Sequence, residues 1–318
     1  MSETLPRGKH ARLALLWRPD FKLSSDEISK LLRSKDEDVR AKVVTRKEVD
    51  DETRGAMALR DPSPYVRAVA LQNLSPESDV FAIACEDPER RARAACARRT
   101  SSEELVRKLS EDSDPTVRTA VAERESIPKD IIERFSRDEN PLVRTAIAGR
   151  LELSEEIIER LFGDDDVTAR NAIARNPATT DGILVKLAAS DSANTRLAVA
   201  GRGKLPDAVA ETLANDQSTR VRIEIANNLA SALSEDVLSK LAKDTAISVR
   251  MAIARRNDLS PNVLATLALD RSSNVAWSPK AKLAKLGGHE KLAALDGFPD
   301  RQRKRLAKSI ASRTGSRQ

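Results

Sequence analysis

Aromatic residues, cysteine and histidine are scarce in this chain of 318 residues. Phe, Trp and Tyr together make up 3% of it, and it has two Cys and two His. Two cysteines exclude a disulfide framework, and with so few His they disfavour a zinc site. Scarce aromatic side chains also disfavour the binding of single-stranded nucleic acid by base stacking. We therefore expect no metal and no other cofactor, and we expect Cys85 and Cys96, which fall at apolar positions, to be buried thiols.

Long apolar runs and catalytic motifs are missing as well. No run of 18 apolar residues occurs, so we expect a cytoplasmic protein with no membrane partner. The 11 glycines are scattered, and no phosphate-binding glycine loop, metalloprotease helix or nucleophile elbow is present. His10 and His289 have no nucleophile motif placed to use them. These absences predict a protein that is not an enzyme and has no evident small-molecule substrate.

What the sequence does have is one short pattern, repeated. The stretch from Asp138 to Arg150 recurs at intervals of 25 to 28 residues, and each copy has an arginine where Arg144 stands. These anchor arginines are Arg12, Arg40, Arg67, Arg93, Arg118, Arg144, Arg170, Arg196, Arg222 and Arg250. An eleventh copy begins at Asp270 and has Ala276 in place of the arginine. Fixed periods of this size are typical of solenoids, in which each repeat buries its apolar face against its neighbours.

Each repeat is predicted to begin with a helix, when positions are counted from the anchor arginine as zero. Position −4 is an N-cap residue in seven repeats, namely Asp36, Ser63, Asp114, Asn140, Asp166, Ser192 and Ser218. Proline follows in three of them, where it suits the first helical position. A helix of about nine residues should therefore start at position −3. A second helix should follow a connector that ends in Ser, Thr or Pro and then acids.

The anchor arginines are predicted to be buried and paired. Positions +3 and +4 are apolar in all ten repeats, which places the anchor on the buried face of the helix. Position −6 offers an aspartate in seven repeats, namely Asp61, Asp87, Asp112, Asp138, Asp164, Asp216 and Asp244. A buried charge is kept only when it is paired. We therefore expect a ladder of Arg–Asp pairs that bridges neighbouring repeats, with Asp138 and Arg144 forming one rung.

The repeats resemble the variant leucine-rich repeats, a family that borders on HEAT-like repeats. In residues 164–189 the resemblance rests on Arg170, Ala172, Ile173, Ala174, Asn176, Pro177, Leu184 and Leu187. It implies an all-α, right-handed superhelical solenoid of ten to eleven two-helix repeats of about 26 residues, in which one helix can be of the 3₁₀ type. One kind of family member holds an iron–sulfur cluster on an N-terminal cysteine cluster. Because no cysteine precedes Cys85, that cofactor is not implied here.

The chain is expected to be one elongated body with capped ends. We expect the repeat solenoid over residues 1–275 with an atypical capping repeat at 1–35, a C-terminal capping segment at 276–300, and a basic, flexible tail at 301–318. The tail has seven Lys or Arg and no acid, so it carries +7 of a net charge of +6. The other 300 residues therefore sum to 6 − 7 = −1. Any attraction of the body for an acidic partner must come from how its charges are arranged.

Arginine gathers at position +6, just beyond the first helix. The family favours Asn there, and Asn73, Asn176 and Asn228 keep it. The other seven repeats have Arg18, Arg46, Arg99, Arg124, Arg150, Arg202 and Arg256, and position +5 adds Arg98, Arg175 and Arg255. A guanidinium group suits phosphate and carboxylate recognition, so these ten arginines are candidate binding residues along one ridge. The alternative is that arginine only caps the C-terminal end of the helix, where a cation is favourable.

Two functions fit this pattern. The first, which we favour, is binding of double-stranded DNA with low sequence specificity, through the arginine ridge and the tail cations Arg301, Arg303, Lys304 and Arg305. The second is a protein-interaction scaffold that docks an acidic partner on the same ridge. The body charge of −1 favours the second function.

Overall fold

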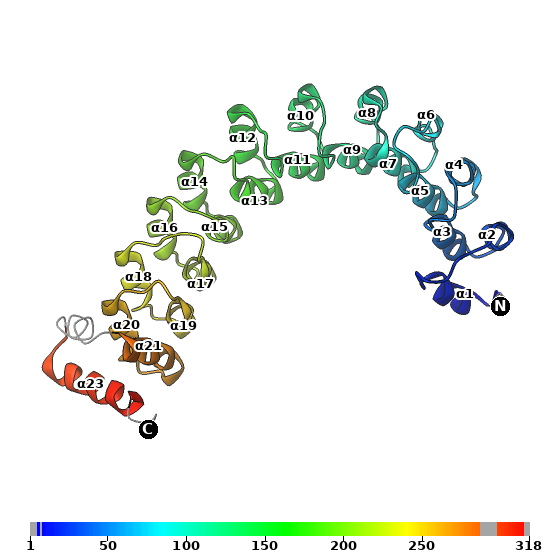
Figure 1. Cartoon of the computed structure of the whole chain (residues 1–318). Helices are drawn as coiled ribbons and strands as arrows, with labels where there is room; N and C mark the ends of the chain where they lie inside the picture. Colours follow the sequence, from blue (N-terminus) through cyan, green and yellow to red (C-terminus); the bar gives the residue numbers. More distant parts are fainter. Residues whose placement is uncertain (1–4, 7, 287–297, 315–318) are drawn as a thin grey trace. The chain divides into compact units, whose positions relative to one another are not determined.

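The chain forms helices throughout the part that the structure describes. The computed structural model describes residues 5, 6, 8–286 and 298–314, and within them it has 22 α-helices and no strand. These helices belong to two compact units, residues 1–147 and residues 148–318 (Figure 1). The predicted all-α class is confirmed. Both helices of a repeat are α-helical within the described residues, so the 3₁₀ type that the resemblance allowed is absent there.

In the first unit the helices form two layers. Layer A holds the first helix of each repeat, and each packs on the next: α1 (Lys9–Leu16), α3 (Glu37–Val44), α5 (Pro64–Gln72), α7 (Arg90–Arg99) and α9 (Pro115–Ala122). Layer B holds the second helices: α2 (Ser25–Leu32), α4 (Asp51–Arg60), α6 (Val80–Ala84), α8 (Glu103–Leu109) and α10 (Lys129–Phe135). Helix α11 (Pro141–Ala148) ends at the boundary between the units.

The second unit repeats this arrangement. Its layer A consists of α13 (Val167–Arg175), α15 (Ala193–Ala200), α17 (Thr219–Asn227), α19 (Ile247–Arg255) and α21 (Ser273–Lys285), each packed on the next. Its layer B consists of α12 (Glu155–Phe162), α14 (Asp181–Ala188), α16 (Asp207–Ala214), α18 (Glu235–Leu241) and α20 (Pro261–Ala268). A last helix, α23 (Asp300–Thr314), packs on α21.

The helix starts follow the predicted caps. Every layer-A helix begins at position −3, from Lys9 in α1 to Ile247 in α19. The side chain at position −4 accepts a hydrogen bond from the first helical turn in five of the seven repeats with a predicted cap, namely those of Asp36, Asp114, Asn140, Asp166 and Ser192. Ser63 and Ser218 begin their helices without such a bond.

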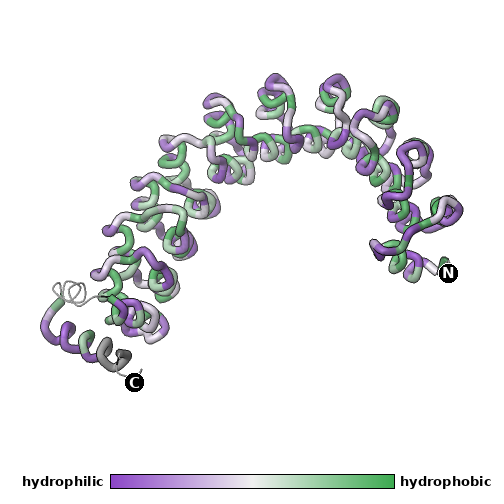
Figure 2. Tube along the Cα trace, viewed as in Figure 1, coloured by the Kyte–Doolittle hydropathy of each residue, from purple (hydrophilic) through white to green (hydrophobic). Residues whose placement is uncertain are grey.

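The core lies between the two layers of each unit. Apolar residues line the faces on which the helices of a repeat meet, while polar residues lie toward the outer turns (Figure 2). Cys85 and Cys96 are buried, as predicted, with 3% and 0% of their surfaces exposed. Burial raises the pKa of the Cys96 thiol to about 12, which makes it an inert core residue.

The C-terminal part differs from the prediction. Helix α21 runs through the boundary predicted at residue 276, so the eleventh repeat has its layer-A helix although it lacks the anchor arginine. Residues 301–314, expected to be a flexible tail, belong to helix α23. Leu306 explains this, because it is 1% exposed and packs in a cluster with Leu264 and Leu283. Residues 287–297 and 315–318 lie outside the described residues.

Candidate functional site

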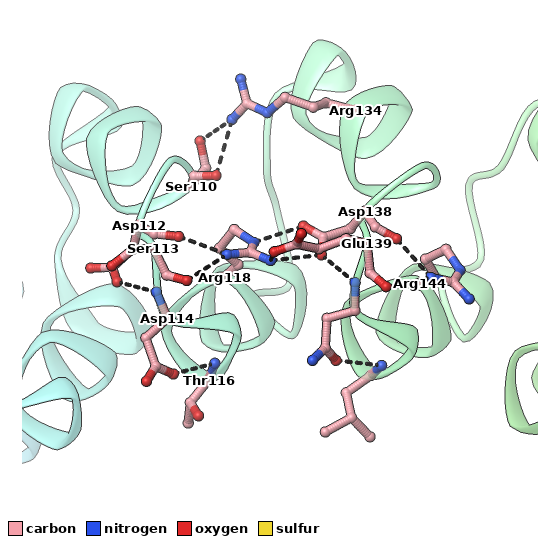
Figure 3. Close-up of polar contacts among 12 residues, drawn as sticks. Ser110, Asp112, Ser113, Asp114, Thr116, Arg118, Arg134, Asp138, Glu139 and Arg144 are labelled. Carbon is pink, nitrogen blue, oxygen red and sulfur yellow. Dashed lines mark hydrogen bonds and ion pairs between the residues drawn. The ribbon is translucent and has the colours of Figure 1, made fainter. Parts of the chain in front are cut away.

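The anchor arginines form the predicted ladder, and Arg118 shows how a rung is built (Figure 3). Its Nε and Nη2 donate to Oδ2 and Oδ1 of Asp138 in the next repeat, at 2.7 and 2.8 Å. On the other side its Nη1 donates to the carbonyl oxygens of Asp112 and Ser113, at 2.8 and 3.1 Å. The side chains of Arg118 and Asp138 are 10% and 8% exposed. One guanidinium group therefore joins the loops of two neighbouring repeats.

The same fork recurs along both units. In the part of the chain that the structure describes, at least seven rungs join the Nε and Nη2 atoms of an anchor arginine to an aspartate of the next repeat: Arg40–Asp61, Arg67–Asp87, Arg93–Asp112, Arg118–Asp138, Arg196–Asp216, Arg222–Asp244 and Arg250–Asp270. The ladder is therefore confirmed in these rungs. Burial is the largest single effect on Asp244 and would raise its pKa, but the hydrogen bonds from Arg222 and from the backbone N–H of Ala246, together with the charges of Arg222 and Arg250, lower that pKa.

The register of the ladder differs from the prediction in one respect. Asp138 was expected to pair with Arg144 of its own repeat. Its carboxylate instead pairs with Arg118, and Arg144 donates to the backbone carbonyl oxygen of Asp138 at 2.7 Å. Asp270 was not among the predicted aspartates, because its repeat has Ala276 as anchor. It nevertheless stands at position −6 and completes the rung of Arg250.

Five of the ten arginines of the predicted ridge are turned toward the neighbouring repeat. Arg46, Arg99, Arg124, Arg202 and Arg256 each donate to backbone carbonyl oxygens at or just beyond the end of the preceding layer-A helix. Arg124, for example, reaches the oxygens of Ala97 and Thr100 at 2.6 and 2.8 Å. The capping interpretation is confirmed for these five arginines, with the cap placed on the preceding repeat and not on their own.

Asparagine or lysine at position +6 can make the same hydrogen bonds to the preceding repeat where arginine is missing. The amide nitrogen of Asn176 donates to the oxygens of Ala148 and Arg150, at 2.7 and 2.6 Å. Asn228 bonds Ala200 and Arg202 in the same way. Lys282, which stands at position +6 of the eleventh repeat, donates to the oxygens of Ala254 and Arg256. In these repeats, position +6 is thus a cross-repeat cap that several donor side chains can fill, whereas Asn73 donates to the carbonyl oxygen of Val69 in its own helix at 2.8 Å. Lys282 could have been found from its spacing to Ala276.

The remaining ridge residues divide by exposure. Arg150 is half-buried, and burial lowers its pKa as it lowers those of Arg124 and Arg202. Arg18, Arg98, Arg175 and Arg255 are exposed. Of these, Arg18 pairs with Asp20 at 3.0 Å and Arg98 with Glu123 at 3.4 Å.

The cations of the predicted tail lie on helix α23. Arg301, Lys304 and Arg305 are exposed, whereas Arg303 is half-buried and its Nε donates to the carbonyl oxygen of Phe298 at 2.6 Å. Lys308 is exposed as well, so the described part of α23 presents four exposed cations next to the last repeat. No helix in the described residues is long and apolar enough to span a bilayer. No group of His, Cys, Asp or Glu in the same part of the chain could hold a metal ion.

The outer face of layer A in the second unit is a surface that the ridge prediction found only in part, through Arg175 and Arg255. Positions −2, +1, +2 and +5 share one side of each helix, and +1 lies between −2 and +5 as an i+3 and i+4 neighbour. We call this side the layer-A face. Position +1 forms an apolar stripe of Leu197, Ile223, Met251 and Trp277, of which Trp277 is 65% exposed. Exposed arginines flank the stripe, namely Arg175, Arg220 and Arg255.

Charge separates between the two layers of this unit. Helices α12, α14, α16 and α18 of layer B contain eight acids and three bases. Helices α13, α15, α17 and α19 of layer A contain seven arginines and one acid, Glu224. Most acids of layer B stand in first helical turns, where the helix dipole favours them. Four of these seven arginines are ladder anchors, so the exposed positive charge of the four layer-A helices comes from Arg175, Arg220 and Arg255, whereas the layer-B helices of this unit are acidic.

Comparison with known proteins identifies the architecture. No family model matches the sequence, and no curated protein does. One solved structure, described as a leucine-rich repeat variant with a novel repetitive protein structural motif, is similar to this chain with a TM-score of 0.56 and 25% sequence identity. The similarity covers 70% of this chain and 88% of that one. Together with the stacked two-helix repeats, this similarity shows that the chain has an α-solenoid fold like that of the leucine-rich repeat variant structure.

Proposed function

We propose that this protein is a non-enzymatic binding scaffold, and that the layer-A face of its second unit holds an extended, acidic protein segment. The observation that carries the proposal is the apolar stripe flanked by exposed arginines, with Glu224 as the one acid on the four helices α13, α15, α17 and α19. An apolar centre with a charged rim is the usual composition of a protein-binding surface, and Trp and Arg are common among the residues that dominate binding energy.

The hydrogen bonds at position +6 guide the choice of partner. Five of the ten ridge arginines donate to carbonyl groups of the preceding repeat, so their guanidinium groups are committed to the fold. A row of ten cations tracking a phosphate backbone is therefore less well supported than a shorter basic and apolar surface. Apolar side chains add nothing to phosphate recognition, whereas they anchor a peptide.

The dimensions of the layer-A face suit a short segment. The stripe runs over α15, α17, α19 and α21, and packed helices lie about 8 to 10 Å apart, so it is about 27 Å long. A chain extended at about 3.3 Å per residue would cover this length with about eight residues. Apolar residues of the segment would contact the stripe, and its acids would pair with the arginines on either side.

Fluorescence anisotropy with two labelled probes tests the proposal. The first probe is a peptide of about 12 residues in which Asp or Glu alternates with Leu, long enough to cover the stripe. The second is a duplex DNA of mixed sequence. Removing the flanking charges, by Arg175→Ala, Arg220→Ala and Arg255→Ala together, should weaken peptide binding by about tenfold, since exposed pairs contribute up to about 1 kcal/mol each.

Two further variants separate the contributions. Ile223→Ser with Met251→Ser should weaken peptide binding and leave any duplex binding unchanged. As a matched control, Lys186→Ala, Lys240→Ala and Lys243→Ala remove three exposed cations outside the layer-A face and should leave the peptide affinity as it is. Peptide binding that none of the layer-A variants weakens would refute the proposal.

Binding of duplex DNA stays the second candidate, and the exposed cations on α23 favour it. Arg301, Lys304 and Arg305 could add phosphate affinity to a basic layer-A face. If DNA is the partner, the duplex probe should bind at low salt, with an affinity that falls steeply as salt rises. The serine double variant would then bind the duplex as well as the original chain does.

A further inference from the structure

We propose that the joint between helices α13 and α15 contains a binding site for a carboxylate, formed by the guanidinium group of Arg170. This site lies in the ladder and is separate from the layer-A face, because positions 0 and −2 point to different sides of the helix. It therefore does not depend on the function proposed above.

Arg170 is the anchor arginine that faces a serine inside the second unit. In the seven rungs described above, the edge formed by Nε and Nη2 holds the aspartate at position −6 of the next repeat. For Arg170 that position is occupied by Ser190. Arg170 keeps the other half of the rung, since its Nη1 donates to the carbonyl oxygen of Asp164. Among the described residues, none accepts a hydrogen bond from its Nε or Nη2.

Ser190 keeps the turn of a normal rung but not its charge. Its Oγ accepts a hydrogen bond from the backbone N–H of Ser192 at 3.3 Å. In the neighbouring rung, Oδ1 of Asp216 accepts the corresponding bond from Ser218 at 2.7 Å, while the same carboxylate pairs with Arg196. A hydroxyl group can accept the bond from the backbone N–H, but it cannot pair with a guanidinium group as a carboxylate does. The half-buried guanidinium edge of Arg170 thus keeps the geometry that holds a carboxylate in every neighbouring rung of this unit.

The chemistry of the site favours a monocarboxylate over a phosphate. The two parallel N–H groups of a guanidinium edge match the two oxygens of a carboxylate. Phosphate could offer the same pair of oxygens, but the exposed side chains of Asp165 and Asp191 lie in the two loops that flank the rung and would repel a dianion. The ligand can be a free small carboxylate or the acidic side chain of a protein, since both present the same group.

The other serine rung is built differently and serves as a contrast. Arg12 faces Ser34 of its next repeat, but its Nε donates to the carbonyl oxygen of Pro6 at 3.1 Å. There the chain itself occupies part of the guanidinium edge. We therefore expect the carboxylate to bind at Arg170 and not at Arg12.

Side-chain NMR of the full chain tests the site. The Nε–Hε signals of the arginines would be recorded while sodium acetate replaces sodium chloride at constant ionic strength, and the signal of Arg170 would be identified by its loss in Arg170→Lys. We expect this signal to shift saturably with acetate, while that of Arg196, whose edge holds Asp216, stays in place. An Arg170 signal that does not move, or that moves no more than that of Arg196, would overturn the proposal.

Ser190→Asp gives an independent check on stability. It supplies the missing carboxylate and should raise the melting temperature, as the seven natural rungs show that aspartate fits there. Acetate should stabilise the original chain against heat, and it should bind at least about tenfold more weakly to Ser190→Asp and to Arg170→Lys, in which the bidentate edge is filled or removed. An equal response of all three chains to acetate, or tighter binding of phosphate than of acetate to the original chain, would contradict a carboxylate site at Arg170.

Discussion

Removing one carboxylate from the ladder should cost far more stability than an ordinary surface substitution. Asp216 is the sharpest case, because its side chain is 3% exposed and that of Arg196 is 7% exposed. The pair makes two hydrogen bonds, at 2.6 and 3.1 Å, and Oδ1 of Asp216 also accepts from the backbone N–H of Ser218. Asp216→Ala would leave a buried guanidinium edge without an acceptor. Breaking a buried pair on one side costs about 3 to 5 kcal/mol, and we expect a loss of that size.

A second rung gives the comparison. In Asp138→Ala, Glu139 stays close to the same arginine, since its Oε1 lies 3.3 Å from Nη2 of Arg118. The loss should therefore be smaller than in Asp216→Ala, because Glu139 can take over part of the pairing. Asp216→Asn, which keeps the shape and the turn but not the charge, should fall between the original chain and Asp216→Ala.

Urea unfolding followed by far-UV circular dichroism would measure these differences. Because repeat proteins can unfold in parts, hydrogen exchange at the amides of α15 and α17 would show whether the loss is local to the broken rung. An Asp216→Ala variant that unfolds at the same urea concentration as the original chain, or an Asp138→Ala variant that loses more stability than Asp216→Ala, would refute this role of the ladder.

The other predictions follow from the caps, the ladder aspartates and the core. Arg202→Ala should lower stability by about 1 to 3 kcal/mol, as the loss of buried hydrogen bonds does. Arg202→Asn should keep most of that stability, because asparagine can cap the preceding repeat. Equal urea midpoints for Arg202→Ala and Arg202→Asn would count against the cross-repeat cap. The pKa values of Asp244 and Asp270 in the folded chain lie below the ordinary value for aspartate. Their contribution to the stability of the fold is therefore fully present above about pH 4, and it is lost as the pH falls from there through the folded pKa. The urea midpoint should therefore stay constant from pH 7 to pH 5 and decline below pH 4. The decline should be less steep in Asp244→Asn than in the original chain. Cys96, buried and with its pKa raised to about 12, should not react with a thiol reagent at pH 8 until urea unfolds the chain, and fast labelling of the native protein would contradict its burial.

Much of the fold could be predicted because the pattern repeats. A buried arginine recurring at each anchor needs a partner, and an aspartate recurs at position −6, so the ladder follows from the sequence. Which repeat supplies the partner does not follow. Asp138 is close in sequence to Arg144, so pairing within the repeat looked natural, and only the stacking of successive repeats brings Asp138 to Arg118.

The direction of the +6 arginines was open for the same reason. A long side chain that follows a helix end can reach either the solvent or the preceding repeat. A guanidinium group is suited to both, because it can bind water, an acidic partner or backbone carbonyl groups. Asn176 and Asn228 were the best clue, since an amide that bonds carbonyl groups is the short equivalent of what Arg202 does.

The layer-A face was hidden because its residues do not repeat. Position −2 holds Thr168, Asn194 and Arg220 in successive repeats, so no regular signal points to it. Residues that hold a solenoid together recur in every repeat, whereas residues that meet a partner need not. The stripe from Leu197 to Trp277 became visible only when the faces of the helices were known.

Some arginines of this chain hold the repeats together and others are proposed to meet a partner, and one comparison tests this division directly. Arg202 is half-buried and bonds the carbonyl oxygen of Asn176 at 2.7 Å, whereas Arg220 is exposed on the layer-A face. For Arg202→Ala and Arg220→Ala, the urea midpoint and the affinity for the acidic peptide would be measured side by side. We predict that Arg202→Ala lowers the midpoint and keeps the affinity, and that Arg220→Ala keeps the midpoint and lowers the affinity. The reverse pattern, or equal effects of the two substitutions on both quantities, would contradict the account.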